Sequence, residues 1–168
     1  QNPKLQPARI DFDRLDDRPG VFQASHVFCA MGTTIKQAGS RERFRQVDFG
    51  YPVRVAELAR AAGARHLLLV SSVGASPASR AFYLRVKGEL EEAILALGFP
   101  SITVVRQSLL LGDRNEFRLG ETIAARLAWA LPRKYRAVHV RDVARALVDA
   151  AVEDRPGVRT IENPDISA

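Results

Sequence analysis

The amino-acid sequence predicts a doubly wound α/β fold, with helices covering both faces of a mostly parallel sheet. Two observations carry this prediction. Short apolar runs alternate along the chain with longer segments whose apolar residues recur at helical spacing. The short runs are apolar at successive positions, which is typical of strands buried on both faces. With 168 residues, 46% of them hydrophobic, we expect residues 1–168 to form a single domain around one core.

The expected elements are bounded by residues that start or stop regular structure. Strands are expected at residues 8–12, 26–31, 65–70, 101–105 and 136–140, and helices at 43–62, 79–97, 119–131 and 142–153. Gly63, Gly98 and Pro132 follow the first three helical patterns and provide their C-terminal stops. Pro52 lies inside the first pattern, so we expect a kink or a restart of the helix there. Asp142 is expected to cap the last helix.

Charge and composition exclude several classes of protein. The chain has 25 Lys and Arg against 19 Asp and Glu, but the basic residues, only four of them lysines, are scattered among acidic ones. We therefore expect a solvated surface of mixed charge and no nucleic-acid partner. No apolar window of about 18 residues is present, so we expect no membrane span. The single Cys29 excludes a disulfide framework and, with no visible signal peptide, we expect a cytoplasmic protein.

Four residues form a constellation that can carry chemistry. Tyr83 and Lys87 are four residues apart in an expected helix and therefore share one of its faces. Ser71 and Ser72 end the apolar run before this helix, where ligands bind in open α/β sheets. An ammonium beside a phenol favours the phenolate, so a tyrosine can exchange a proton with a carbonyl or alcohol whose oxygen a serine holds. The structural alternative is that Tyr83 packs on the core while Lys87 extends to solvent.

Other catalytic and metal motifs are missing from the sequence. It contains no Gly-x-Ser-x-Gly nucleophile elbow and no Gly-x4-Gly-Lys-Ser/Thr phosphate loop. His26, His66 and His139 lie near expected strand starts, without a carboxylate or second histidine at the local spacing of a metal motif, so we expect no metal. Residues 123–131, which include Trp129, fit either the core or a dimer face, so a homo-oligomer is compatible with the sequence.

Two groups of motifs resemble those of known oxidoreductases. The first is Ser71-Ser-Val-Gly-Ala75 followed by Tyr83-x3-Lys87-Gly-Glu89. The second comprises Cys29-Ala-Met-Gly-Thr-Thr34 with Lys36 and Gly39, Val47-Asp48, and Arg106-Gln-Ser-Leu-Leu-Leu-Gly-Asp-Arg114 with Glu116, Arg118 and Gly120. On these motifs, from about residue 9 to residue 150, the chain resembles the short-chain dehydrogenases/reductases. Within them it is most similar to the atypical branch typified by the Tat-interacting-protein-like oxidoreductases.

The resemblance implies a Rossmann-type fold that binds a dinucleotide, and a role for each matched residue. Tyr83 would donate or accept the proton, Lys87 would orient the nicotinamide ribose, and Ser71, or else Ser72, would position the carbonyl. Residues 107–168 would contribute the substrate side. The further cofactor-binding residues would be Met31 and Gly32 on the adenosine-ribose side, and Leu110 and Arg118 near the nicotinamide half and the phosphates. The implied cofactor is NADP(H), with NAD(H) as the second choice.

The sequence departs from this pattern at two places. Arg106-Gln107 stands where such families usually carry Arg-Pro. No Gly-x-Gly-x-x-Gly or Gly-x-x-Gly-x-x-Gly turn, which brings the backbone to the cofactor's pyrophosphate, occurs in the sequence. In a 3-2-1-4-5 strand order, residues 8–12 and 26–31 would be the third and fourth strands, with two missing strands between them. We therefore expect the sequence to be an excerpt that lacks an N-terminal unit of about 30 residues or more.

The expected function is an NADP(H)-dependent oxidoreductase that transfers a hydride at the carbonyl or alcohol of a small-molecule substrate. An alternative is a non-catalytic regulatory or interaction protein that senses NADPH and uses the Tyr83–Lys87 pair only to grip the ribose. A nucleic-acid binder is a third reading, and the low aromatic content of 7%, without a stacking motif, speaks against it.

Overall fold

Four parallel strands form the central sheet in a computed structural model that describes residues 3–108, 110–111 and 132–166. The strand order is β1-β2-β3-β6, and β4 pairs with β5 in a separate two-stranded sheet, also parallel. The strands are β1 (His26–Cys29), β2 (His66–Ser72), β3 (Ser101–Gln107), β4 (Leu110–Leu111), β5 (Val138–His139) and β6 (Gly157–Glu162). The predicted fold class is confirmed.

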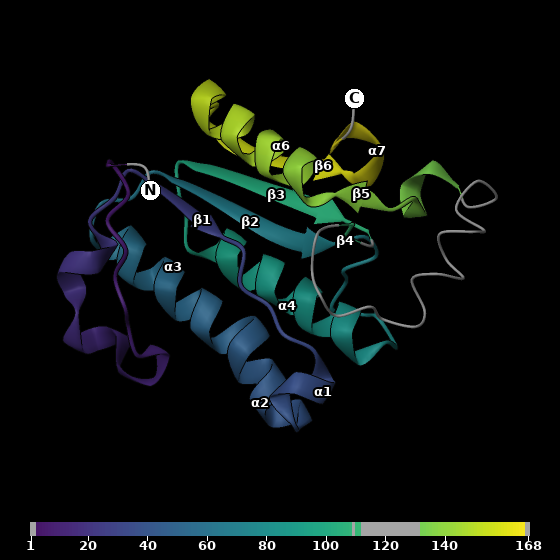
Figure 1. Ribbon diagram of the computed structural model, residues 1–168, viewed down its shortest axis with the longest axis horizontal. Coiled ribbons are helices and arrows are strands. Elements are labelled where there is room, and N and C mark those ends of the chain that lie inside the picture. The colour runs from purple at the N-terminus through teal and green to yellow at the C-terminus, as the bar shows by residue number, and fades with distance from the viewer. Residues whose placement is uncertain (1–2, 109, 112–131, 167–168) are drawn as a thin grey trace.

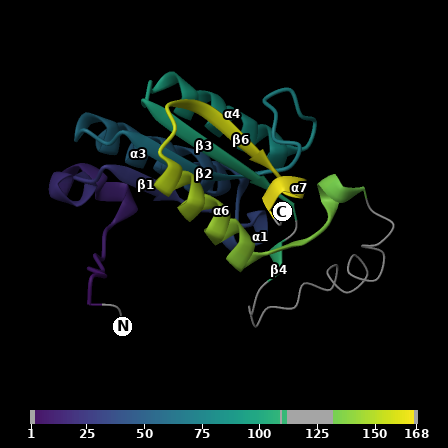
Figure 2. The same ribbon diagram turned by 90° about the horizontal axis from the view of Figure 1, so that it is seen from above.

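Helices cover both faces of this sheet, as the doubly wound prediction requires. Helices α3 and α4 lie against one face and α6 against the other (Figures 1 and 2). The α-helices are α1 (Ile35–Ala38), α2 (Arg41–Arg45), α3 (Tyr51–Ala61), α4 (Phe82–Ala96), α6 (Val140–Glu153) and α7 (Asn163–Ile166). The 3-10 helices are η1 (Phe12–Asp17), η2 (Pro19–Phe22) and η4 (Arg133–Tyr135), and η3 (Gln46–Gly50) is a π-helix.

Strand β2 is buried on both sides, which explains its unbroken apolar sequence. Its Leu67 and Leu69 pack with Ile94 of α4 in the core on one face. Leu68, which points the other way, packs with Leu147 of α6 in the core on the opposite face. Because successive residues enter different cores, apolar and polar residues do not alternate.

The helix expected at residues 43–62 is divided by a π turn. Helix α2 leads into η3, and α3 begins at Tyr51 with Pro52 in its first turn. Proline has no backbone N–H to donate to the preceding turn, and the wider π turn directly before it accommodates the missing hydrogen bond. The α-helix therefore restarts at Tyr51, directly before Pro52, and the Asp48 side chain of η3 is buried in the protein interior.

Two local predictions were wrong. Residues 8–12 form no strand: the side chain of Asp11 accepts a hydrogen bond from the N–H of Asp13 and caps η1 instead. Asp142 does not cap α6, because that helix begins two residues earlier and His139 Nδ1 accepts the N–H of Arg141 as its cap. Asp142 lies in the first turn, where its negative charge interacts favourably with the helix dipole.

Strand β6 was not expected from the sequence. This strand pairs with β3 from Ser101↔Gly157 to Arg106↔Glu162, and four of its six residues are exposed, so it lacks the apolar run that marks a buried strand.

The helix expected at 119–131 lies outside the described residues, and the substrate-side role of residues 107–168 stays a prediction. Among the helices that the structure describes, none has the length and apolar character needed to cross a membrane.

Gly88 of α4 lies where a loop packs directly on the helix. A Cβ atom there would overlap the backbone of Ser76 and Pro77, and the N–H of Ser76 donates to the carbonyl of Leu84. Gly88→Ala should therefore cost about 1–3 kcal/mol of unfolding free energy, measured by urea denaturation. Gly50→Ala is the control, because its Cβ would meet nothing closer than 4.0 Å. Equal stability of the two variants would contradict this account of the loop.

Candidate functional site

One face of α4 places three polar side chains beside the carboxyl ends of the strands. Tyr83, Lys87 and Glu91 follow each other at four-residue intervals, so they lie along the same side of the helix. Each contacts a different part of the fold. Tyr83 contacts α2, Lys87 contacts η3, and Glu91 contacts β2 and β3.

Lys87 and Asp48 form a buried ion pair at the centre of the site. The Lys87 ammonium lies 2.9 Å from Asp48 Oδ1, and both side chains are at most 5% exposed. Asp48 Oδ2 accepts the backbone N–H of Thr33 at 2.8 Å, which ties the pair to the loop after β1. Burial makes each charge depend on the other for its stabilisation. The pair therefore fixes the position of the lysine ammonium, which does not extend to solvent.

The loop after β1 approaches this ion pair closely at Gly32. A Cβ on Gly32 would lie 3.4 Å from Asp48 Oδ1 and 3.9 Å from Lys87 Nζ. Met31, the other residue predicted on this loop, is half-buried and packs against the core shared with α3 and α4. The structure thus brings Gly32 beside Lys87, as the resemblance implies for two residues of one site.

Tyr83 lies one helical turn before Lys87 and is 37% exposed. Its ring centroid is 6.0 Å from that of Phe44 of α2, which is buried. Its hydroxyl has no hydrogen-bond partner among the described residues. An exposed phenol one helical turn from a buried ammonium can exchange a proton with a bound molecule.

Ser71 is engaged in a buried network and is not free at the strand end. Its hydroxyl donates to Oε1 of Glu91, whose Oε2 accepts from Nη2 of Arg106 at 2.6 Å. Nη1 of Arg106 reaches Oε1 of Glu162 on β6 at 3.2 Å. The hydrogen bond to Glu91 raises the pKa of Arg106 above its usual range. The network joins α4 to three strands, so the structure shows Ser71 in a structural contact.

Ser72 and Gln107 are less constrained at the same edge. Successive residues of β2 point to opposite faces, and the Ser72 hydroxyl makes only a 3.4 Å contact with the carbonyl of Val73. Gln107 is the register partner of Ser72, and its backbone carbonyl accepts the N–H of Val73. Strand β3 therefore continues through the position where the families that this chain resembles usually have proline. The side-chain Oε1 of Gln107 is buried without a hydrogen-bond partner among the described residues.

The other predicted cofactor-binding residues either lie apart from Tyr83 and Lys87 or fall outside the described residues. Leu110 is in β4 and packs against the α6-side core, and Arg118 lies outside the described residues. Asp48 and Glu91 were missed as contacts of the site. For Glu91 the signal was present, because it continues the four-residue spacing of Tyr83 and Lys87. Asp48 reaches Lys87 only through the π turn, which the sequence pattern does not reveal.

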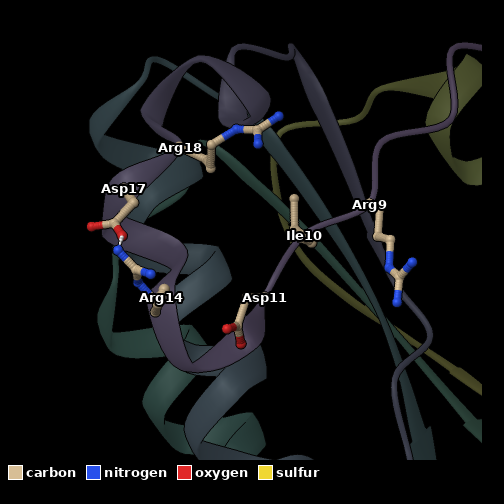
Figure 3. A pocket seen from close by; sticks show the side chains of 6 residues that line it. All are labelled: Arg9, Ile10, Asp11, Arg14, Asp17 and Arg18. Atoms are coloured by element: carbon tan, nitrogen blue, oxygen red, sulfur yellow. Dashed lines mark ion pairs between the residues drawn. The ribbon is translucent and has the colours of Figure 1, made fainter.

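A cavity of about 590 Å³ near the N-terminus is separate from these residues. Its lining residues are Arg9, Ile10, Asp11, Arg14, Asp17 and Arg18. Figure 3 shows that Arg9 and Arg18 point in different directions, and Arg14 is paired with Asp17 at 2.6 Å. The arginine side chains do not converge on a common point, so the cavity offers no cradle for an anion.

Sequence comparison gives clear relatives. The chain is 40% identical over 162 residues to the protein HTATIP2 of Rattus norvegicus, which covers 94% of this chain and 66% of the rat protein. It is 46% identical over 91 residues to FMP52-1, mitochondrial, of Scheffersomyces stipitis, covering 54% of this chain and 40% of that protein. The chain thus spans about two thirds or less of the length of these relatives. No protein-family model matches it.

Solved structures show the same fold at low sequence identity. UDP-glucose 4-epimerase of Thermotoga maritima, solved with UDP-glucose, has a TM-score of 0.68 at 15% identity, covering 91% of this chain and 61% of the epimerase. RMD from Pseudomonas aeruginosa, complexed with NADPH, has a TM-score of 0.67 at 17% identity, covering 93% of this chain and 66% of RMD. These likenesses show the Rossmann-type fold, in agreement with the strand arrangement described above.

Proposed function

Because the chain belongs to the homologous family of the HTATIP2 and FMP52 proteins, we propose that it is an NADP(H)-dependent oxidoreductase of the short-chain dehydrogenase/reductase type. The substrate is a small carbonyl or alcohol. One observation carries this proposal: the exposed phenol of Tyr83 lies one turn from the buried Lys87 ammonium, beside the carboxyl ends of the strands. This is where α/β sheets of this type bind their ligands.

The residues present fit the nicotinamide half of such a cofactor. Lys87 offers a fixed cation, Gly32 leaves room beside it, and Gln107 Oε1 offers an acceptor that lacks a donor among the described residues. The Gly-rich turn that would meet the pyrophosphate is not part of these 168 residues. NADP(H), when bound, supplies or takes the hydride. In the reduction direction Tyr83 donates its hydroxyl proton to the developing alkoxide, and Asp48 keeps Lys87 in place.

Of the two serines, Ser72 is the better candidate to hold the substrate oxygen, because Ser71 already donates to Glu91. Ser72→Ala should lower kcat roughly 100-fold, with little change in stability. Ser71→Ala should instead cost about 1–3 kcal/mol of unfolding free energy, since Glu91 loses a buried donor. Turnover assays and urea denaturation of both variants distinguish these roles. A reversed pattern, with Ser71→Ala inactive but stable, would assign the substrate oxygen to Ser71.

Binding and turnover experiments test the proposal as a whole. NADPH, NADH and reduced nicotinamide mononucleotide are titrated by nicotinamide fluorescence. The mononucleotide is included because Lys87, Gly32 and Gln107 would meet the nicotinamide half of the cofactor. A panel of aldehydes and ketones then follows NADPH consumption by absorbance. We expect binding, with NADPH preferred over NADH, and turnover of at least one carbonyl class. Absence of binding by all three nicotinamides would overturn the proposal.

One observation favours a non-catalytic regulator as the second candidate. Lys87 is paired with Asp48 and Ser71 with Glu91, so two of the four predicted catalytic residues already have partners within the protein. A sensor would bind NADPH without consuming it on any carbonyl. Cell fractionation tests the proposed cytoplasmic location, and a mitochondrial location, as in the names of the FMP52 relatives, is the alternative outcome.

A further inference from the structure

Two histidines and an aspartate meet at the opposite end of the sheet from Tyr83 and Lys87. His26 begins β1 and His66 begins β2, and the two are register partners in the parallel ladder, so their side chains are neighbours on one face. Asp154 follows α6 as its C-cap in the left-handed region, with φ of 42°. Residues far apart in the sequence thus converge, which explains why no local metal motif marks them.

The ligand atoms of this cluster have distances close to those of a tetrahedral zinc site. His66 Nδ1 lies 3.0 Å and His26 Nε2 lies 3.2 Å from the same oxygen, Asp154 Oδ1. All three ligand atoms lie within 4.8 Å of one another. Zinc bonds of about 2.0–2.2 Å place tetrahedral ligand atoms roughly 3.3 Å apart. The two nitrogen–oxygen distances are already close to this value.

The outer contacts of both histidines support such a site. His66 Nε2 lies 3.0 Å from the hydroxyl of Thr103, and His26 Nδ1 lies 2.9 Å from the hydroxyl of Ser25. A hydroxyl can accept the ring N–H as well as donate to the ring, so either tautomer is accommodated. With the proton on the outer nitrogen, the inner nitrogen is free to bind a metal. His26 Nε2 is buried and makes no hydrogen bond among the described residues, despite its distance to Asp154.

The charges around Asp154 leave one of its oxygens for a metal. Arg65 Nη2 contacts Oδ2 at 3.3 Å, whereas Oδ1 faces the two histidines. The carboxylate would therefore bind through one oxygen only. Two imidazole nitrogens and one carboxylate oxygen are a ligand set that suits Zn²⁺, with the fourth position open to water. The His66 side chain is 1% exposed, whereas those of His26 and Asp154 are 23% and 28% exposed, so an ion can enter from their side.

We propose that His26, His66 and Asp154 form a binding site for Zn²⁺ at the amino edge of the sheet. The ion would join the starts of two strands to the end of α6. Because the cluster lies at the other end of the strands from Tyr83, the ion would take no part in the proposed proton transfer. The site does not depend on the oxidoreductase proposal, and its test needs no substrate or dinucleotide.

The test is a metal titration of the chelator-treated full chain. Isothermal titration calorimetry with Zn²⁺ should give one site per chain, Co²⁺ should give the visible absorption of tetrahedral coordination, and Zn²⁺ should raise the Tm. His26→Gln and Asp154→Asn each remove one ligand and should weaken Zn²⁺ binding roughly 100-fold or more. Asparagine tolerates the left-handed backbone at residue 154, and residue 26 is on an edge strand, so both variants should fold.

His139→Asn is the matched control, because it removes the other histidine of the chain while an asparagine can still cap α6. It should bind Zn²⁺ like the parent protein. Circular dichroism checks the fold of every variant. The proposal is overturned if the parent chain binds no Zn²⁺. It is equally overturned if folded His26→Gln or Asp154→Asn binds as tightly as the parent, or if His139→Asn loses binding as they do.

Discussion

Lys87→Met is expected to be the most destabilising single change at the site. Methionine fills a similar volume but leaves Asp48 charged and without its ion-pair partner in the interior. Breaking a buried ion pair from one side costs about 3–5 kcal/mol, a large part of the stability of a small domain. Urea denaturation followed by circular dichroism measures the loss, which should appear as a lower midpoint at unchanged slope.

A second substitution separates charge from packing in this prediction. Adding Asp48→Asn to Lys87→Met removes the unpaired charge and should recover a large part of the lost stability, because the amide oxygen can still accept the N–H of Thr33. Arg14→Met, at an exposed ion pair with Asp17, is the matched control and should change stability little. If Lys87→Met alone unfolds at the parent midpoint, the ion pair does not stabilise the fold.

Tyr83→Phe is expected to remove turnover and to leave cofactor binding nearly intact. The ring keeps its contact with Phe44, so only the hydroxyl that we propose as the proton donor is lost. Loss of a general acid lowers kcat by roughly 10²–10⁴-fold. The measurement pairs NADPH titration by fluorescence with steady-state kinetics on the best carbonyl substrate.

Tyr135→Phe is the control for Tyr83→Phe, since Tyr135 is also exposed and has Lys134 beside it in the sequence. Its turnover should match that of the parent protein. Retained turnover in Tyr83→Phe would show that the phenol is not the proton donor. If the parent protein binds NADPH but turns over no carbonyl substrate, the regulatory alternative is favoured instead.

The fold was predictable where burial leaves a mark on the sequence. Strands β2 and β3 are buried on both faces, so their apolar runs indicated both their type and their parallel pairing. Strand β6 lies at an edge with most of its residues exposed, and its sequence reads as a loop. Residues 8–12 alternate like a strand, but the carboxylate of Asp11 satisfies the backbone of the next turn locally and starts η1.

The sequence predicted which residues of the candidate site share one helix, but not which residues of other helices and strands they contact. Helical spacing alone places Tyr83 and Lys87 on one face of α4. It does not show that Asp48 meets Lys87, because Asp48 lies in a π turn that the sequence pattern does not reveal. Neither can it choose between Ser71 and Ser72, whose side chains point to opposite faces of the sheet. The strand register brings His26 and His66 together, so the spacing of residues along the sequence does not reveal their cluster with Asp154 either.

The contacts of α4 have a consequence for how substrates could vary among related proteins. Lys87 and Glu91 hold the helix to η3 and to the sheet through separate buried partners. Turning the helix by one residue, about 100° around its axis, would detach both at once. The side of α4 from which Tyr83 projects is therefore set by contacts within the protein. Under the proposed function, changes in the size or shape of a substrate would have to be met by segments other than this helix.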